Sequence, residues 1–225
     1  MSALRTAGRP ASQGFCVAFF GPDGVGKSAV IEQVKKHLAT DFSTVIQFHF
    51  RPRFGRGSLG CTPVTDPHAQ NPRRLLISFA KLIYWLLDCW YGYLLALRPG
   101  LQRSRLVIFD RYYPDLLVDP LRYRLPAASL RFAQWLVALA PRPDLCVVLD
   151  APAEVVQRRK HEVSPAESQR QRLAYLALFH SMPVKLLVNA NLPVNEVAQQ
   201  VSVAVFVLLN SSSMQPHEAL VLADF

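Results

Sequence analysis

One short stretch, residues 20–30 with the sequence FGPDGVGKSAV, constrains the fold of this chain more than any other. It places three glycines beside a lysine and a serine directly after an apolar run, although glycine is unfavourable inside a strand or a helix. The spacing fits the pattern G-x-x-x-x-G-K-S/T, with Gly21, Gly26, Lys27 and Ser28 at the fixed positions. It predicts a loop that wraps a phosphate group between a buried strand and a helix.

The residue types of this loop are suited to binding a nucleoside triphosphate. Glycines let the backbone turn its N–H groups inward, and the following helix offers the positive end of its dipole. We expect Lys27 to reach the β- and γ-phosphates and Ser28 to ligate the Mg²⁺ that accompanies the nucleotide. The predicted ATP-binding residues are Gly21, Pro22, Asp23, Gly24, Val25, Gly26, Lys27, Ser28 and Ala29.

Strand and helix patterns alternate along the rest of the chain. Short apolar runs at 14–20, 44–50, 106–110, 144–150 and 184–190 are typical of parallel strands that are buried on both faces. Helical patterns fill the intervals, at about 27–38, 75–97, 129–140, 193–209 and on both sides of HEVSPAE. The alternation predicts an α/β fold, a P-loop NTPase three-layer sandwich with a parallel sheet of about five strands.

The length of 225 residues predicts one domain. We assign residues 14–209 to a P-loop kinase domain with a short lid at about 158–170. Residues 1–13 lack the apolar segment of a secretory signal, and we expect a flexible leader. A transit peptide is the alternative, since these residues contain no acidic side chain. Residues 210–225 are expected to be a flexible tail.

A formal net charge of +9 predicts an anionic partner. The basic residues stand singly or in short loops, without a long basic run or a zinc-finger pattern, which favours small phosphorylated ligands over nucleic acid. The cysteines at 16, 61, 89 and 146 have no metal-binding spacing. They are read as buried thiols in a reducing cytosol, so we expect a cytoplasmic protein.

The segment 75–97 is long and apolar enough to span a bilayer, because Lys81 and Asp88 are its only charged residues. At helical spacing, however, its polar residues share one narrow stripe, which disfavours membrane insertion. The stripe contains Arg74, Ser78, Lys81, Trp85, Asp88 and Gly92. Two interpretations stay open: Lys81 and Asp88 point to solvent from a core helix, or they line a ligand cleft.

The strand 106–110 ends in Asp110, at the edge of the sheet where such folds bind ligands. We predict that Asp110 and Ser28 hold the metal ion. The residues after it, Arg111, Tyr112 and Tyr113, are expected to face the same crevice.

Taken together, the motifs resemble those of the thymidylate kinases, a family of nucleoside monophosphate kinases, over about residues 15–209. GPDGVGKS is similar to the family's G-x-D-G-x-G-K-S/T, FRP at 50–52 to its R-E-P, and DRY at 110–112 to its D-R-Y/H. DLCVVLDAPAEVVQRR is similar to its D-L-x-x-x-L-D-x-x-x-E-x-x-x-x-R. The resemblance implies an ATP-dependent kinase that acts on a nucleoside monophosphate, with dTMP as the leading acceptor.

The resemblance also implies roles for single residues. Asp23 would contact the acceptor sugar, Arg51 and Arg111 would hold the acceptor phosphate, and Trp85 stands near the base-stacking aromatic position. The full acceptor-binding set is Asp23, Arg51, Lys81, Trp85, Arg111 and Tyr112. Family members are commonly dimers through an apolar helix face, which the segment 75–97 would suit.

Phosphoryl transfer needs a cation near the transferred group, and the loop itself contains no arginine. The basic cluster QRRKHEVSPAESQRQR is the candidate source, so Arg158 and Arg159 join Lys27 and Arg111 as predicted catalytic residues. A solvated helix surface is the alternative interpretation of this cluster.

Two departures from the family pattern concern the acceptor. The segment YPDLLVDPLRYR stands where the family has S-x-x-A-Y-Q, and Cys89 stands near the position of its base-reading arginine. The acceptor could therefore be a sugar or sugar phosphate of polysaccharide biosynthesis, with Asp115 and Asp119 binding hydroxyls or acting as a base. Turn formation beside proline explains the two aspartates equally well. A non-catalytic ATP-binding regulator is the third hypothesis.

Overall fold

A computed structural model describes residues 14–50, 72–94, 104–159 and 164–211. The expected leader, residues 160–163 of the expected lid, residues 212–225 of the expected tail and Arg51 lie outside these residues. The first two residues of the expected tail belong to the last helix. A single parallel sheet has the strand order β2-β3-β1-β4-β5. Its strands are β1 (Phe15–Phe20), β2 (Thr44–His49), β3 (Arg105–Asp110), β4 (Leu145–Asp150) and β5 (Lys185–Asn189). The predicted five-stranded parallel sheet is confirmed.

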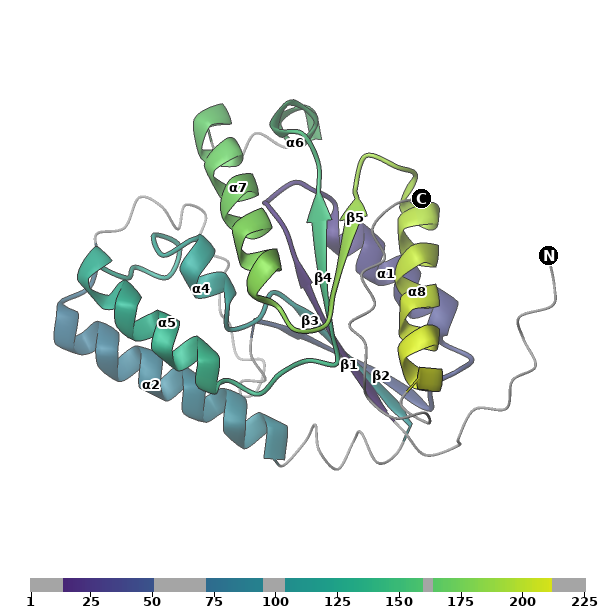
Figure 1. The fold of residues 1–225 in the computed structure, drawn as a ribbon, viewed down its shortest axis with the longest axis horizontal. Helices are drawn as coiled ribbons and strands as arrows, with labels where there is room; N and C mark the ends of the chain where they lie inside the picture. Colours follow the sequence, from purple (N-terminus) through teal and green to yellow (C-terminus); the bar gives the residue numbers. More distant parts are fainter. Residues whose placement is uncertain (1–13, 51–71, 95–103, 160–163, 212–225) are drawn as a thin grey trace, which may run out of the picture.

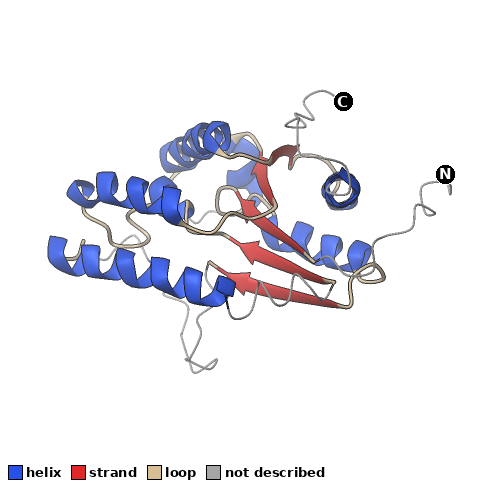
Figure 2. Cartoon of the chain, turned by 60° about the horizontal axis from the view of Figure 1, so that its bottom comes forward, coloured by secondary structure: helices blue, strands red, loops and turns tan. Residues whose placement is uncertain are grey.

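Helices cover both faces of this sheet, which gives the three predicted layers (Figure 1). One face is covered by α1 (Lys27–Leu38) and α8 (Val194–Ser211), and the other by α2 (Leu75–Gly92), α5 (Leu130–Leu139) and α7 (Pro165–Ser181). Shorter helical segments are α4 (Asp115–Val118), η3 (Ala127–Ser129) and α6 (Ala153–Arg159). Helices α2 and α5 run side by side in both ribbon views (Figures 1 and 2).

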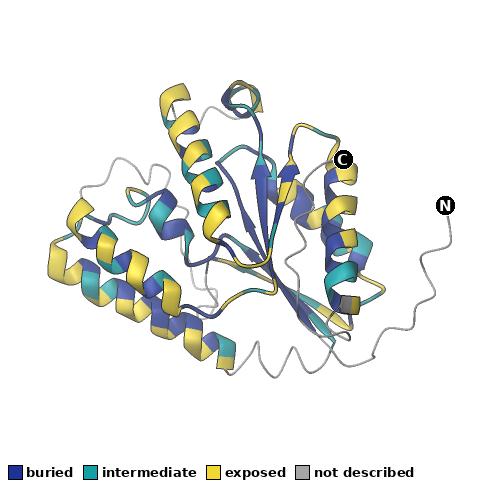
Figure 3. Ribbon diagram, viewed as in Figure 1, coloured by how far each residue is buried: buried dark blue, intermediate teal, exposed yellow. Residues whose placement is uncertain are grey.

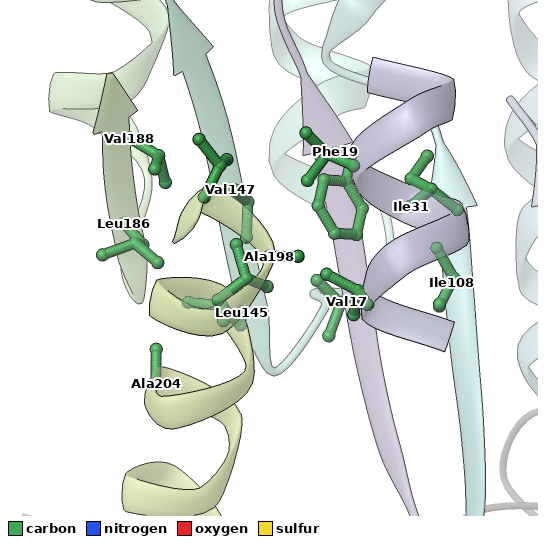
Figure 4. Close-up of a cluster of buried hydrophobic side chains, with 14 of the residues drawn as sticks. Val17, Phe19, Ile31, Ile108, Leu145, Val147, Leu186, Val188, Ala198 and Ala204 are labelled. Atoms are coloured by element: carbon green, nitrogen blue, oxygen red, sulfur yellow. The ribbon is translucent and has the colours of Figure 1, made fainter. Parts of the chain in front are cut away.

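Strand β1 is buried along its whole length because it is the central strand. Alternate side chains point to opposite faces, as the period of two requires. Val17 and Phe19 face α1 and α8, where they meet Ile31 and the small residue Ala198 (Figure 4). Cys16, Ala18 and Phe20 face the cluster formed with α2, α5 and α7. The continuous apolar run of β1 therefore contributes side chains to two separate hydrophobic cores, one on each face of the sheet.

The register of the strands brings distant residues to one edge of the sheet. Asp110 at the end of β3 lies opposite Phe19 of β1 and opposite His49 of β2. The peptide N–H of Arg111 donates to the carbonyl of Phe19 at 3.0 Å. Because the phosphate-loop motif follows β1 directly, the residues after β3 are held beside it.

Helix α2 turns its polar stripe inward and its apolar side outward (Figure 3). Asp88 is buried, so the interpretation that it points to solvent is wrong, whereas Lys81 is half-buried. On the outer side, Leu76 is 81% and Leu87 is 61% exposed. By length and composition α2 is apolar enough to cross a membrane, and 39% of it is buried within the molecule.

Candidate active site

The loop between β1 and α1 adopts the backbone conformation that its glycines permit. Gly21, Gly24 and Gly26 have φ angles of 144°, 82° and 105°, which residues with a side chain rarely adopt. At Gly21, an added Cβ would also lie 2.7 Å from the carbonyl oxygen of Leu149. The glycine spacing is thus required by the path of the backbone against β4.

Lys27 begins α1 and folds back into the loop. Its Nζ donates to the carbonyl oxygens of Gly21 and Pro22 at 2.6 and 2.7 Å. Burial is the main cause that lowers the pKa of Lys27 to about 7, and repulsion from Arg111 is the second cause. The loop therefore holds a cation inside its own turn, close enough to Arg111 for the two charges to interact.

Asp110 has one carboxylate oxygen engaged and one buried without a partner. Its Oδ2 lies 3.3 Å from Nδ1 of His49, whereas Oδ1 accepts no hydrogen bond from the described residues. Burial alone would raise the pKa of Asp110, but the His49 hydrogen bond and the charge of Lys27 lower it below its usual value. Asp110 is an anion beside Lys27, and Ser28 is exposed at the start of α1. These oxygen donors fit the ligand preference of Mg²⁺.

Arg111 is a buried cation at the end of β3. Its side chain is 4% exposed, and its φ angle of 68° is unusual for a residue with a side chain. Nη1 donates at 2.9 Å both to Asp115 Oδ2 and to the hydroxyl of Tyr175, and Nη2 donates to Asp23. The guanidinium thus joins the phosphate loop, α4 and α7.

Asp115 is fully buried, and both of its carboxylate oxygens accept hydrogen bonds. It accepts from Tyr175 at 2.6 Å and from Tyr123 at 2.7 Å, in addition to Arg111. Burial would raise its pKa, but the charge of Arg111 and the hydrogen bonds of the two tyrosines lower it. Asp119 is also buried, and it accepts from the peptide N–H of Arg122 at 3.2 Å. The structure does not support the hypothesis that these aspartates bind acceptor hydroxyls or act as a base, because both oxygens of the buried Asp115 are engaged and Asp119 is only 1% exposed.

Asp23 is shared between two arginines. One oxygen pairs with Arg111 and the other with Arg122, so the carboxylate lies between two guanidinium groups. Burial would raise the pKa of Asp23, but Arg111, Lys27 and Arg122 together lower it. Arg122 is 23% exposed, and its Nε is buried without a hydrogen bond to the described residues, 3.3 Å from Asp119 Oδ2. The sequence contained this arginine within YPDLLVDPLRYR, but nothing local distinguished it from its neighbours.

An aromatic cluster adjoins these charges. The rings of Phe50, Trp85 and Tyr123 lie with centroids 4.8 to 5.9 Å apart, and Lys81 Nζ is 5.6 Å from the Trp85 ring. Because the hydroxyl of Tyr123 reaches Asp115, the cluster is continuous with the Arg111 network. The structure therefore brings Lys81 and Trp85 to the same region as Arg111, as predicted from the spacing.

Tyr112 and Tyr113 do not join this site. Tyr112 is 3% exposed and packs on Phe109, with ring centroids 4.7 Å apart. Tyr113 is fully buried, and its hydroxyl donates to the carbonyl of Leu82 at 2.8 Å. Both side chains belong to the core between the sheet and α2. The expectation that they face the crevice, and that Tyr112 contacts the acceptor, is thus at odds with the structure.

The two predicted arginines of α6 differ in their contacts. Nη1 of Arg159 donates to the carbonyl oxygens of Val25 and Ala190 at 2.9 and 3.0 Å, so it lies against the phosphate loop. Arg158 is exposed. Arg172 of α7 forms two hydrogen bonds with Asp150, at 2.7 and 2.8 Å, and so fixes α7 to the end of β4.

Comparison with known proteins agrees with this arrangement. The chain is 30% identical over 203 residues to a thymidylate kinase from Akkermansia muciniphila, which covers 84% of this chain and 90% of the relative. It is 31% identical over 112 residues to a probable thymidylate kinase from Pyrococcus abyssi, and 29% identical over 119 residues to a thymidylate kinase from Xanthomonas campestris. The last two matches span about half of those relatives, 53% and 50%. No protein-family model matches the chain.

The chain belongs to the thymidylate kinase family. Its parallel sheet and phosphate-loop motif place it among the P-loop kinases of that family. Two features of this member stand out in the described residues: the paired arginines on Asp23, and the enclosed Asp115.

Replacement of Asp115 by asparagine tests whether this carboxylate stabilises the buried Arg111 charge. Breaking a buried ion pair on one side costs about 3–5 kcal/mol, so we expect a loss of that order in the free energy of unfolding at pH 7. Because folding lowers the pKa of Asp115, its contribution is present above its unfolded value of about 4 and disappears as the pH falls further. Urea unfolding from pH 7 to pH 3 should show a shallower decline for the variant.

The exposed Glu154→Gln substitution on α6 is the matched control, since it also removes one carboxylate charge. It should change the free energy of unfolding by less than about 0.5 kcal/mol. Equal stability of Asp115→Asn and Glu154→Gln would show that Arg111 does not depend on Asp115.

Proposed function

We propose that this protein is an ATP-dependent kinase that transfers the γ-phosphoryl group to a nucleoside monophosphate, with dTMP as the leading acceptor. The observation that carries the proposal is the Asp23–Arg111 pair, because Asp23 belongs to the phosphate-loop motif and Arg111 follows β3. The pair links a site for the donor phosphates to a guanidinium that suits a second phosphate. The names of the relatives support the same activity.

On the donor side, the loop residues 21–29 would hold the triphosphate of ATP through their N–H groups, and Lys27 would contact its phosphates. Ser28 and Asp110 would hold Mg²⁺, for which the unpartnered oxygen of Asp110 is suited. The bound ion supplies charge neutralisation to the transferred group. Arg159, which already lies against Val25, and Arg158 beside it would supply further positive charge.

On the acceptor side, Arg111 and Arg122 would bind the phosphate of the acceptor, and Trp85 would stack against its base. Arg51 is proposed to join them, although it lies outside the described residues. Asp23 occupies the space between the two described arginines, and a phosphate dianion can compensate both guanidinium charges when it takes that place. Lys81, beside Trp85, borders the same region.

A kinase of another small phosphorylated acceptor, such as a sugar phosphate, is the second candidate. The observation that favours it is Cys89, which is 1% exposed and occupies the position near which the family has a base-reading arginine. A site that lacks a polar contact to the base discriminates less strongly between bases. A regulator that binds ATP without phosphoryl transfer is the third candidate.

Purified protein with ATP, Mg²⁺ and separate acceptors tests the three candidates. We expect ADP release with dTMP, and a loss of about 100-fold or more in kcat/KM for Lys27→Met, since the variant lacks the cation at the phosphates. Turnover of a sugar phosphate in place of dTMP would support the second candidate. ATP binding without ADP release for any acceptor would contradict kinase activity.

Arg122→Gln tests the second arginine of the acceptor site. Loss of a charge-assisted hydrogen bond of about 1.5–3 kcal/mol should raise the KM for the acceptor by about tenfold or more. The KM for ATP should change by less than about twofold, because Arg122 contacts the phosphate loop at the Asp23 carboxylate, whereas the loop N–H groups and Lys27 are proposed to hold the triphosphate. Arg124→Gln, two residues along the same segment, is the control. Equal changes in both Michaelis constants would show a general effect on folding.

We also propose that the outer face of α2 forms a homodimer. Leu76, Leu87 and Tyr91 expose a contiguous apolar helix side, and contiguous apolar patches of this kind mark interaction surfaces. Leu87→Glu should convert a dimer into a monomer in sedimentation equilibrium. Leu173→Glu on α7, where the leucine is 57% exposed, should leave the dimer intact. A monomeric native protein would contradict the proposal.

A further inference from the structure

An apolar cavity lies away from the phosphate loop, on the face of the sheet that α5 and α7 cover. Its volume is about 370 Å³, within the range of about 300–1,000 Å³ that is typical of small-molecule sites. It is lined by Phe20 and Cys146 of the sheet, by Val137 of α5 and by Leu178 of α7. Val137 and Leu178 pack against the neighbouring hydrophobic cluster but are only half-buried, so part of their apolar surface stays accessible at the cavity.

The polar groups of this cavity are few, and one of them is a cation. Arg142, in the proline-flanked connection from α5 to β4, lines the cavity and is exposed. Within the described residues it forms no ion pair. Its neighbour Asp144 is engaged elsewhere, since Oδ2 accepts from the peptide N–H of Cys16 at 2.7 Å. An anionic group of a ligand could therefore contact Arg142 while an apolar body fills the cavity.

We propose that this cavity binds a small amphipathic acid, with an apolar body between α5 and α7 and a carboxylate or similar anion at Arg142. Burial of apolar surface would supply most of the affinity, and the exposed cation would select for the charge. The site is distinct from the ATP and acceptor sites. It adjoins the proposed acceptor site along the chain, because Tyr112 follows Arg111, Pro114 precedes Asp115, and both Tyr112 and Pro114 line the cavity.

A ligand in this cavity would contact residues that adjoin the proposed active site. Tyr112 follows Arg111 directly, and Leu178 lies one helical turn after Tyr175, whose hydroxyl contacts both Arg111 and Asp115. A ligand packed against Tyr112 and Leu178 would restrain the neighbouring residues that hold the Arg111 guanidinium. The binding test below does not depend on the kinase activity, so the two proposals fail separately.

Decanoate is a suitable probe, with 1-decanol as its neutral counterpart, both below the concentrations at which they aggregate. Isothermal titration of the wild-type protein should show one decanoate per chain. Ala138→Trp places a large side chain on an exposed residue of the cavity wall and should weaken decanoate binding by about tenfold or more. Ala177→Trp, the same change at an exposed residue of α7 outside the cavity, should leave it unchanged.

Two further variants separate the cavity from its charge. Gln134→Trp, on the exposed rim, is a second blocking substitution and should act like Ala138→Trp if the fold is retained by circular dichroism. Arg142→Gln should weaken decanoate by about two- to fivefold, the range for an exposed ion pair, and leave 1-decanol unaffected. The proposal is overturned if the wild-type protein binds neither probe. That result is expected if another part of the chain fills the cavity. It is equally overturned if Ala138→Trp and Ala177→Trp bind decanoate alike.

Discussion

The buried positive charge of Arg111 is the constraint on which the site depends. A guanidinium removed from water is strongly unfavourable unless anions and hydrogen-bond acceptors surround it. Here Asp115 and Asp23 supply the charge, and Tyr175 supplies an acceptor. These three residues come from α4, the phosphate loop and α7. One cation therefore fixes the relative positions of three segments that are far apart in the sequence.

The same charge explains why Asp115, in the segment after Arg111, is structural. Asp115 has to stay ionised to compensate Arg111, and hydrogen bonds from Tyr175 and Tyr123 hold it in that state. A carboxylate whose pKa is lowered and whose oxygens are already engaged is a poor general base. The segment after Arg111 thus stabilises the charge of the arginine, and Asp115 is unsuited to act as the general base.

Local patterns predicted most of the fold but only part of the site. The glycine spacing from Gly21 and the apolar period of the strands are properties of neighbouring residues, so the loop motif, the five strands and their layers could be read from the sequence. His49, Arg122 and Tyr175 were missed, because their roles arise from partners that lie 61 to 99 positions away. The inward turn of Tyr112 was missed for a related reason. It depends on the core between the sheet and α2, which no local pattern specifies.

Asp23 also bears on the nature of the acceptor. In the described structure it neutralises Arg111 and Arg122 at once, so an acceptor that reaches these arginines has to displace a carboxylate from two guanidinium groups. A neutral hydroxyl cannot compensate the charges left behind, and uncompensated buried charge is costly. A phosphate dianion compensates both and can form paired hydrogen bonds with each arginine. If Arg111 and Arg122 hold the acceptor as proposed, the geometry argues against an unphosphorylated sugar, and the aromatic surface around Trp85 would discriminate between a nucleotide and a sugar phosphate.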